Sequence, residues 1–76
     1  MFITISLAIE KERFDLQIDS KQQIKDILEV LNSSGKMSCA KIPDFFRSNI
    51  LQRAVSSYKT FEEEKIYSGD ILTAIF

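Results

Sequence analysis

The chain has 76 residues with ten basic and eleven acidic side chains, and its net charge is −1. This length allows one domain with one small core, and a content of 45% hydrophobic residues excludes a disordered chain. The balanced charge and the scattered basic residues argue against nucleic-acid binding.

Histidine is absent and Cys39 is the single cysteine, which excludes an internal disulfide and the common zinc sites. Without a histidine to activate it, the Cys39 thiol is expected to behave as a small hydrophobic side chain. The first residues alternate between apolar and polar, unlike a signal peptide. No apolar run reaches the roughly 20 residues of a membrane span. We therefore expect a cytoplasmic protein with no membrane insertion, no metal and no cofactor.

Two alternating segments open the chain. Residues 2–10 predict a half-buried strand whose inward side chains are Ile3, Ile5, Leu7 and Ile9. Residues 14–19 predict a second strand whose inward side chains are Phe14, Leu16 and Ile18. The polar stretch between them lacks an Asn-Gly pair, which predicts a hairpin with a loop of three to five residues.

The apolar period changes after Ser20, where a helix is predicted. Ser20 and Gln23 have the spacing of a capping box, in which each side chain binds the other residue's backbone amide. The apolar residues that follow recur at helical spacing, and they are Ile24, Ile27, Leu28 and Leu31. The helix is expected to end at Ser33 or Ser34, with Gly35 as its left-handed cap.

The second half of the chain carries weaker patterns. Residues 36–44 predict a loop in which Met37 or Ile42 anchors to the core. Residues 45–49 and 51–55 predict two short strands around a tight turn, and residues 60–66 predict a single turn. In that turn Phe61 and Ile66 are expected to point inward. Residues 68–70 reverse the chain before a closing strand over residues 71–76.

This order of elements predicts an α+β β-grasp fold as a single domain over residues 1–76. The helix has one apolar stripe, so it covers one face of a sheet. If the last strand lies beside the first, both strands are central and parallel, and the chain crosses over through the helix in the right-handed sense. The expected sheet is mixed, has four to five strands and packs on one helix.

The chain resembles ubiquitin in the order and spacing of these elements. The resemblance rests on the start MFITIS, the hairpin, the helix that closes on Gly35 and the late segment TFEEEKIYSGDIL. Among ubiquitin-like proteins the chain is most similar to the bacterial YukD/EsaB-like family, which accompanies type VII secretion systems. It shares with that family the strand start and the Gly-Asp pair before an apolar closing strand. The resemblance implies an accessory or regulatory protein, or the same fold as a domain of a larger secretion component.

No catalytic motif is present. The sequence contains no Gly-rich phosphate loop and no Ser-His or Cys-His pair. Residues Glu62, Glu63 and Glu64 are interpreted as a solvated acidic turn, and Asp70 as a turn residue. The chain is therefore not expected to be an enzyme.

The last residues bear on two alternative functions. Conjugating modifiers and sulfur carriers of this fold use a flexible diglycine end, because glycine is narrow enough to enter an activating enzyme. This sequence ends in TAIF. A C-terminal carrier or modifier is therefore the disfavoured alternative to a non-conjugating interaction module.

Protein binding is the expected function, and the closing strand indicates which face of the sheet carries the binding surface. If Leu72, Ala74 and Phe76 face the helix, then Ile71 and Ile75 lie on the open face of the sheet. The predicted protein-binding set adds either of two phenylalanines and two flanking arginines, and its members are Phe45, Phe46, Arg47, Arg53, Ile71 and Ile75. A shifted alternation, or a loop that covers these residues, would remove this surface. A structural homodimer through the same face is the remaining alternative use of it.

Overall fold

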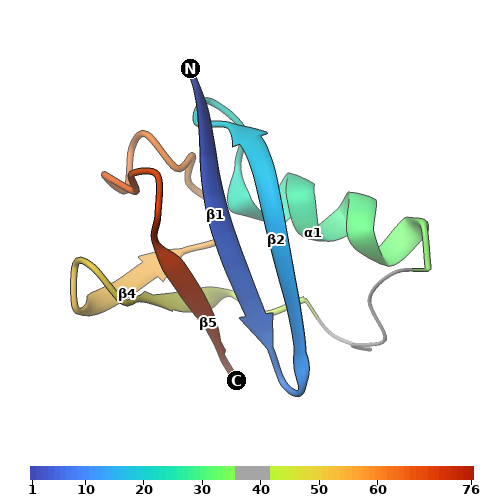
Figure 1. Ribbon diagram of the computed structural model, residues 1–76. Coiled ribbons are helices and arrows are strands. Elements are labelled where there is room, and N and C mark those ends of the chain that lie inside the picture. Colours follow the sequence, from blue (N-terminus) through green and yellow to red (C-terminus); the bar gives the residue numbers. More distant parts are fainter. Residues whose placement is uncertain (36–41) are drawn as a thin grey trace.

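The computed structural model describes residues 1–35 and 42–76. It contains a five-stranded sheet in the order β2-β1-β5-β3-β4, and one helix lies across one face of this sheet (Figure 1). The elements in chain order are β1 (Phe2–Ile9), β2 (Glu12–Asp19), α1 (Ile24–Ser33), β3 (Phe45–Ser48), β4 (Arg53–Ser56) and β5 (Ile71–Ile75). The α+β β-grasp architecture predicted from the sequence is confirmed.

The first and last strands form the centre of the sheet. β1 and β5 run parallel, with Leu7 opposite Leu72. β1 also pairs with β2 and β5 also pairs with β3, both antiparallel. The predicted parallel pairing of the two terminal strands is therefore confirmed, and the two chain ends lie at opposite ends of the sheet (Figure 1).

The hairpin loop is shorter than predicted. Ile9 pairs with Glu12, so only Glu10 and Lys11 make the turn. Glu10 adopts a positive φ of 55°, the left-handed conformation that Asn-Gly turns usually supply. The prediction of three to five residues is wrong because it relied on turn-type residues, whereas here the pairing of the two long strands determines the loop length.

The helix buries the predicted stripe. Ile24, Leu28 and Leu31 are buried, and Ile27 is partly buried against the core. The predicted C-terminal cap is also confirmed, because α1 ends at Ser33 and Gly35 has a φ of 75°.

The predicted capping box at the start of this helix is wrong. The N-cap residue is Gln23, and its side chain makes no capping hydrogen bond. The first helical amides are bound instead by a distant segment. The amide of Ile24 donates to the carbonyl of Lys59 over 3.3 Å, and the amide of Lys25 donates to the carbonyl of Ser57 over 2.7 Å.

One core fills the space between the sheet and the helix. Its buried hydrophobic residues are Ile3, Ile5, Leu7, Ile9, Ile18, Ile24, Leu28, Leu31, Phe46, Val55, Phe61, Ile66 and Leu72. Phe61 and Ile66 point inward as predicted. Ile42 packs partly buried against the core, as expected for an anchor of the loop that precedes β3. The predictions for Met37 and Cys39 fall outside the described residues.

A reciprocal capping box exists in the segment before β5. The amide of Glu63 donates to the Thr60 hydroxyl, and the Glu63 carboxylate accepts from the amide of Thr60, both over 3.0 Å. This pair orders the turn that carries Phe61 and Ile66 into the core. The Thr-x-x-Glu spacing is visible in the sequence.

Candidate functional site

The sheet has one face that α1 does not cover. Alternate residues of each strand point to this open face, and at one end it carries two apolar side chains. Phe45 of β3 and Ile75 of β5 are direct partners across the two strands. Phe45 is 52% exposed and Ile75 is 43% exposed. Two large apolar side chains therefore lie next to each other at the surface.

A shallow pocket continues from this pair. Its volume is about 290 Å³, and its lining residues are Pro43, Asp44, Phe45, Ile75 and Phe76. Phe76 was expected to face the helix, but it follows the last residue of β5 and is 66% exposed. The prediction extended the strand alternation beyond the point where β5 stops pairing. We call Phe45, Ile75 and Phe76 the β3–β5 patch.

Hydrogen bonds hold the wall of the pocket in place. The Ser57 hydroxyl donates to the carbonyls of Pro43 and Asp44, in both cases over 2.8 Å. The Ser57 amide also donates to the Asp44 carbonyl over 2.9 Å. The Asp44 carboxylate accepts from the Tyr58 hydroxyl over 2.7 Å, and this hydrogen bond raises the pKa of Tyr58. The patch therefore borders a fixed acidic wall.

Arg47 and Ile71 share the open face with the patch. Arg47 is exposed, lies opposite Thr73, and donates from its guanidinium to the Gln52 side chain over 3.2 Å. Ile71 is partly exposed and pairs with Ser6 of β1. Thr73 lies between Ile71 and Ile75 on this face, so Ile71 is separated from the patch by a polar residue.

Two members of the predicted set lie on the other side of the sheet. Phe46 is fully buried in the core, which resolves the choice that the sequence left between the two phenylalanines. Arg53 lies opposite the buried Ser48 and binds Glu64, with its guanidinium 2.6 Å from the Glu64 carbonyl. Arg53 therefore packs on the helix side and does not flank the patch. Arg53 stands two residues before Val55 in β4 and so shares its face, and the burial of Val55 in the fold determines which face this is.

The opposite half of the open face is mostly polar, and its one large apolar side chain, Phe2 of β1, lies beside Asp19. The Ser6 hydroxyl donates to the Asp15 carboxylate over 2.6 Å, and the Arg13 guanidinium lies 3.4 Å from the same carboxylate. The hydrogen bond from Ser6 and the charge of Arg13 lower the pKa of Asp15. The apolar end of the face is thus the part suited to an apolar contact.

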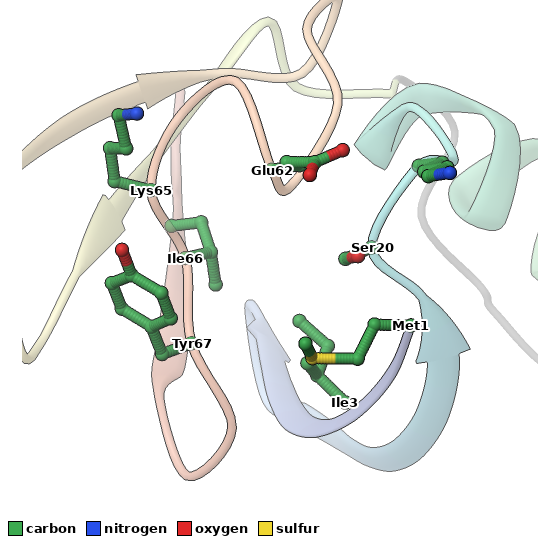
Figure 2. A pocket seen from close by; sticks show the side chains of 8 residues that line it. Met1, Ile3, Ser20, Glu62, Lys65, Ile66 and Tyr67 are labelled. Atoms are coloured by element: carbon green, nitrogen blue, oxygen red, sulfur yellow. The ribbon is translucent and has the colours of Figure 1, made fainter.

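A second cavity, of about 400 Å³, opens between the start of β1 and the segment before β5 (Figure 2). Its lining residues are Met1, Ile3, Ser20, Lys21, Glu62, Lys65, Ile66 and Tyr67. Although this cavity is larger, Ile3 and Ile66 are core residues and the charged lining groups are of both signs. Its lining therefore selects no ligand class. The β3–β5 patch is the better candidate because the lining of its pocket is apolar apart from Asp44, whereas the cavity mixes Met1 and Tyr67 with charged side chains of both signs.

Asp70 is buried, and its contacts explain it as a structural group. Its carboxylate accepts from the Ser48 hydroxyl, from the Ile50 amide over 3.0 Å and from the Ile71 amide over 2.7 Å. Within residues 1–35 and 42–76 no group of three or more histidine, cysteine, aspartate or glutamate side chains is placed to hold a metal ion. In the same residues no helix is long and apolar enough to cross a membrane.

No protein-family model and no curated protein sequence matches the chain. Solved structures match it by fold. The C-terminal ubiquitin-like domain of mouse tubulin-specific chaperone e has a TM-score of 0.68 at 11% identity, with 96% of this chain and 84% of that chain covered. The EccD5 ubiquitin-like domain from Mycobacterium xenopi has a TM-score of 0.62 at 13% identity and covers 100% of this chain and 94% of that one. Ubiquitin from Caldiarchaeum subterraneum has a TM-score of 0.60 at 15% identity, with 100% and 96% covered. The chain therefore has a ubiquitin-like fold.

Proposed function

We propose that this ubiquitin-like domain binds a partner protein through the β3–β5 patch. The observation that carries the proposal is the direct pairing of Phe45 with Ile75, both about half exposed on the uncovered face. Contiguous exposed apolar side chains commonly mark an interface, and aromatic side chains contribute strongly to binding. Ile75 and Phe76 come from one strand end and Phe45 from its neighbour, so the rigid sheet presents all three together.

We further propose that the domain serves a bacterial type VII secretion system as a non-conjugating accessory or regulatory component. The sequence resemblance to the YukD/EsaB-like family supports this assignment. The similarity of fold to the ubiquitin-like domain of EccD5, a type VII secretion protein, is consistent with it. A cytoplasmic location belongs to the same proposal.

The binding proposal is tested with two glutamate variants. Ile75→Glu places a charge in the patch, and Val30→Glu places the same charge on α1, where Val30 is 66% exposed. Each is titrated by calorimetry against the purified proteins encoded beside the gene, one at a time. Ile75→Glu should weaken the interaction at least about tenfold, which corresponds to about 1.4 kcal/mol, whereas Val30→Glu should leave it unchanged.

Other outcomes contradict the proposals separately. If Ile75→Glu binds the partner with the wild-type affinity, then the patch does not take part in the interaction. A gene neighbourhood without secretion ATPase genes contradicts the type VII assignment and leaves the patch untouched. The carrier or modifier alternative predicts a covalent adduct or thiocarboxylate at the C-terminus. The intact mass of the protein from its native host therefore decides between the alternatives.

A further inference from the structure

β2 is a long strand at the edge of the sheet. It has eight residues, whereas β4 at the opposite edge has four. Beyond β2 the described part of the chain adds no further strand (Figure 1). β2 contains no proline that would prevent pairing. Long edge strands invite pairing with another strand unless proline, charge or a covering element prevents it.

The hydrogen-bond pattern identifies the backbone groups at this edge. The Ser20 amide donates to the Met1 carbonyl over 2.8 Å, one position beyond the pair of Phe2 with Asp19. Along an antiparallel ladder, residues whose amide and carbonyl bond to the neighbouring strand alternate with residues whose amide and carbonyl point away from it. Ser20 bonds to Met1, which directly precedes β1, so every second residue before Ser20 bonds to β1, and the amides and carbonyls of Phe14 and Leu16 point toward β1. The amides and carbonyls of Arg13, Asp15 and Gln17 therefore point away from the sheet.

The outward direction is supported at the end of the strand. Asp19 follows Gln17 by two residues, so its amide also points away from β1. This amide donates to the side chain of Gln22 over 3.3 Å. The three preceding outward residues form a short stretch of backbone to which an antiparallel strand fits. A second copy of the same strand brings complementary charges to it.

Every antiparallel register centred on a residue of β2 keeps the like faces of the two copies on the same side, and the registers near the middle of the strand pair the most residues. A register centred on Gln17 sets Asp15 against the second copy's Asp19, which is unfavourable. A register centred on Asp15 sets that carboxylate against itself, which is unfavourable. A register centred on Leu16 places Arg13 opposite the second copy's Asp19, but the Asp19 amide is already bound by the Gln22 side chain, so this pair lacks a backbone hydrogen bond. A register centred on Phe14 places Arg13 opposite the second copy's Asp15, and does so twice by symmetry.

We propose that two copies of this chain pair through β2 in the register centred on Phe14. The sheet then continues across both copies, with the two Phe14 side chains facing each other at the symmetry axis. Phe14 is only partly buried in one chain although it lies on the core face, so pairing covers apolar surface that β1 and α1 leave accessible. The pairing uses the edge of the sheet and leaves the β3–β5 patch free.

Sedimentation equilibrium over a series of protein concentrations tests this pairing. Wild type is expected to show a monomer–dimer equilibrium. Arg13→Asp should raise the dissociation constant at least about tenfold, because two opposite-charge pairs become like-charge pairs. The double variant R13D/D15R exchanges the charges and should restore the dimer. A wild-type chain that stays monomeric, or a double variant no better than Arg13→Asp, overturns the proposal.

A cysteine pair determines the register and does not depend on charge. With Cys39 replaced by serine, Phe14→Cys places two thiols at the symmetry axis. The Cα atoms of such a non-hydrogen-bonded pair are about 4.5 Å apart, which suits a disulfide. Leu16→Cys is the matched control, because its thiol faces Glu12 of the second copy. Oxidation should link Phe14→Cys into a covalent dimer and not Leu16→Cys, and the reverse result overturns the register.

Two further controls separate folding and partner binding from pairing. Thermal unfolding followed by circular dichroism shows whether each variant keeps the wild-type fold, and only folded variants are compared. Ile75→Glu should leave the dimer unchanged, and Arg13→Asp should leave binding to the partner protein unchanged. If Ile75→Glu dissociates the dimer, then the β3–β5 patch is the homodimer surface and pairing through β2 is wrong.

Discussion

The Asp70 carboxylate joins two turns that lie far apart in the sequence. It binds the Ser48 hydroxyl and the Ile50 amide at the β3–β4 turn, and also the amide of Ile71 at the start of β5. The residue is 1% exposed. A buried carboxylate is tolerated only when hydrogen bonds replace its hydration, and these three do so. Asp70 therefore fixes β5 relative to β3, which places Ile75 beside Phe45.

Replacing Asp70 tests this role. Asp70→Ala should lower the free energy of unfolding by about 3 kcal/mol or more, because it leaves a buried hydroxyl and two amides without their acceptor. Asp70→Asn keeps the shape and one acceptor oxygen, and should cost about 1 kcal/mol. Urea denaturation measures both. Equal losses for the two variants would show that packing, and not hydrogen bonding, explains the effect.

Neighbouring residues with similar side chains have opposite roles in β3. Phe45 and Phe46 are both aromatic, and the sequence alone does not show which one faces inward. The pairing of Phe46 with Val55 and Ala74 directs it into the core, and Phe45 is therefore exposed. In a four-residue strand the alternation is too short to choose a face, so the neighbouring strands decide it.

At the scale of elements, two segments have capping-box spacing and only one forms the motif. Ser20 and Gln23 precede the apolar stripe of α1, but the carbonyls of Ser57 and Lys59 bind the first helical amides. Thr60 and Glu63 form the reciprocal pair. A helix start that packs against another segment does not need a side-chain cap, because the packed backbone supplies the acceptors.

Matched alanine variants measure this difference. Thr60→Ala should lower the free energy of unfolding by about 1 kcal/mol, because the Glu63 amide loses its acceptor. Ser20→Ala should change it by less than about 0.5 kcal/mol, because the Ser20 side chain lines the second cavity and caps no amide. Chemical denaturation compares them. A larger loss for Ser20→Ala than for Thr60→Ala would contradict the observed capping.

For the whole molecule, the pH dependence of stability follows from three carboxylates. Hydrogen bonds from Thr60 lower the pKa of Glu63 below its ordinary 4.5. A hydrogen bond from the Ser6 hydroxyl lowers the pKa of Asp15 below its ordinary 3.8. A hydrogen bond from the Lys21 amide lowers the pKa of Asp19 below the same value. A carboxyl group whose pKa is lower in the folded chain stabilises the fold above its unfolded pKa. That stabilisation is lost as the pH falls through the folded pKa.

The free energy of unfolding should therefore decline as the pH falls below the ordinary value of 4.5 for Glu63, and decline further below 3.8. Thermal melts from neutral to acidic pH measure this decline. In Glu63→Gln the melting temperature should decline less steeply just below pH 4.5, because the glutamine side chain takes up no proton in that range. Melting temperatures that rise on acidification would contradict the assignment.

The sequence by itself determined the order of the elements and the architecture of this protein. Three local patterns predict these elements: the two long alternating segments, the helical stripe and the apolar closing strand. Each pattern can be recognised in the sequence because an element that buries one face repeats its apolar residues with the period of that element. One face of the helix carries Ile24, Leu28 and Leu31, and their spacing alone determines this. Gly35 can end the helix by its own backbone conformation, without a contact to a distant segment.

Only the tertiary structure decided the details that depend on partners far along the chain. The carbonyls that start α1 come from residues 57 and 59, and the pairing of β3 with β4 and β5 exposed Phe45 and turned Arg53 toward Glu64. Phe76 joined the surface because β5 stops pairing one residue earlier. Each of these outcomes depends on register and on long-range hydrogen bonds, which no local pattern contains. The sequence therefore predicted an exposed apolar pair on the open face, and the fold shows which of the predicted residues lie there. Binding through these residues stays a proposal.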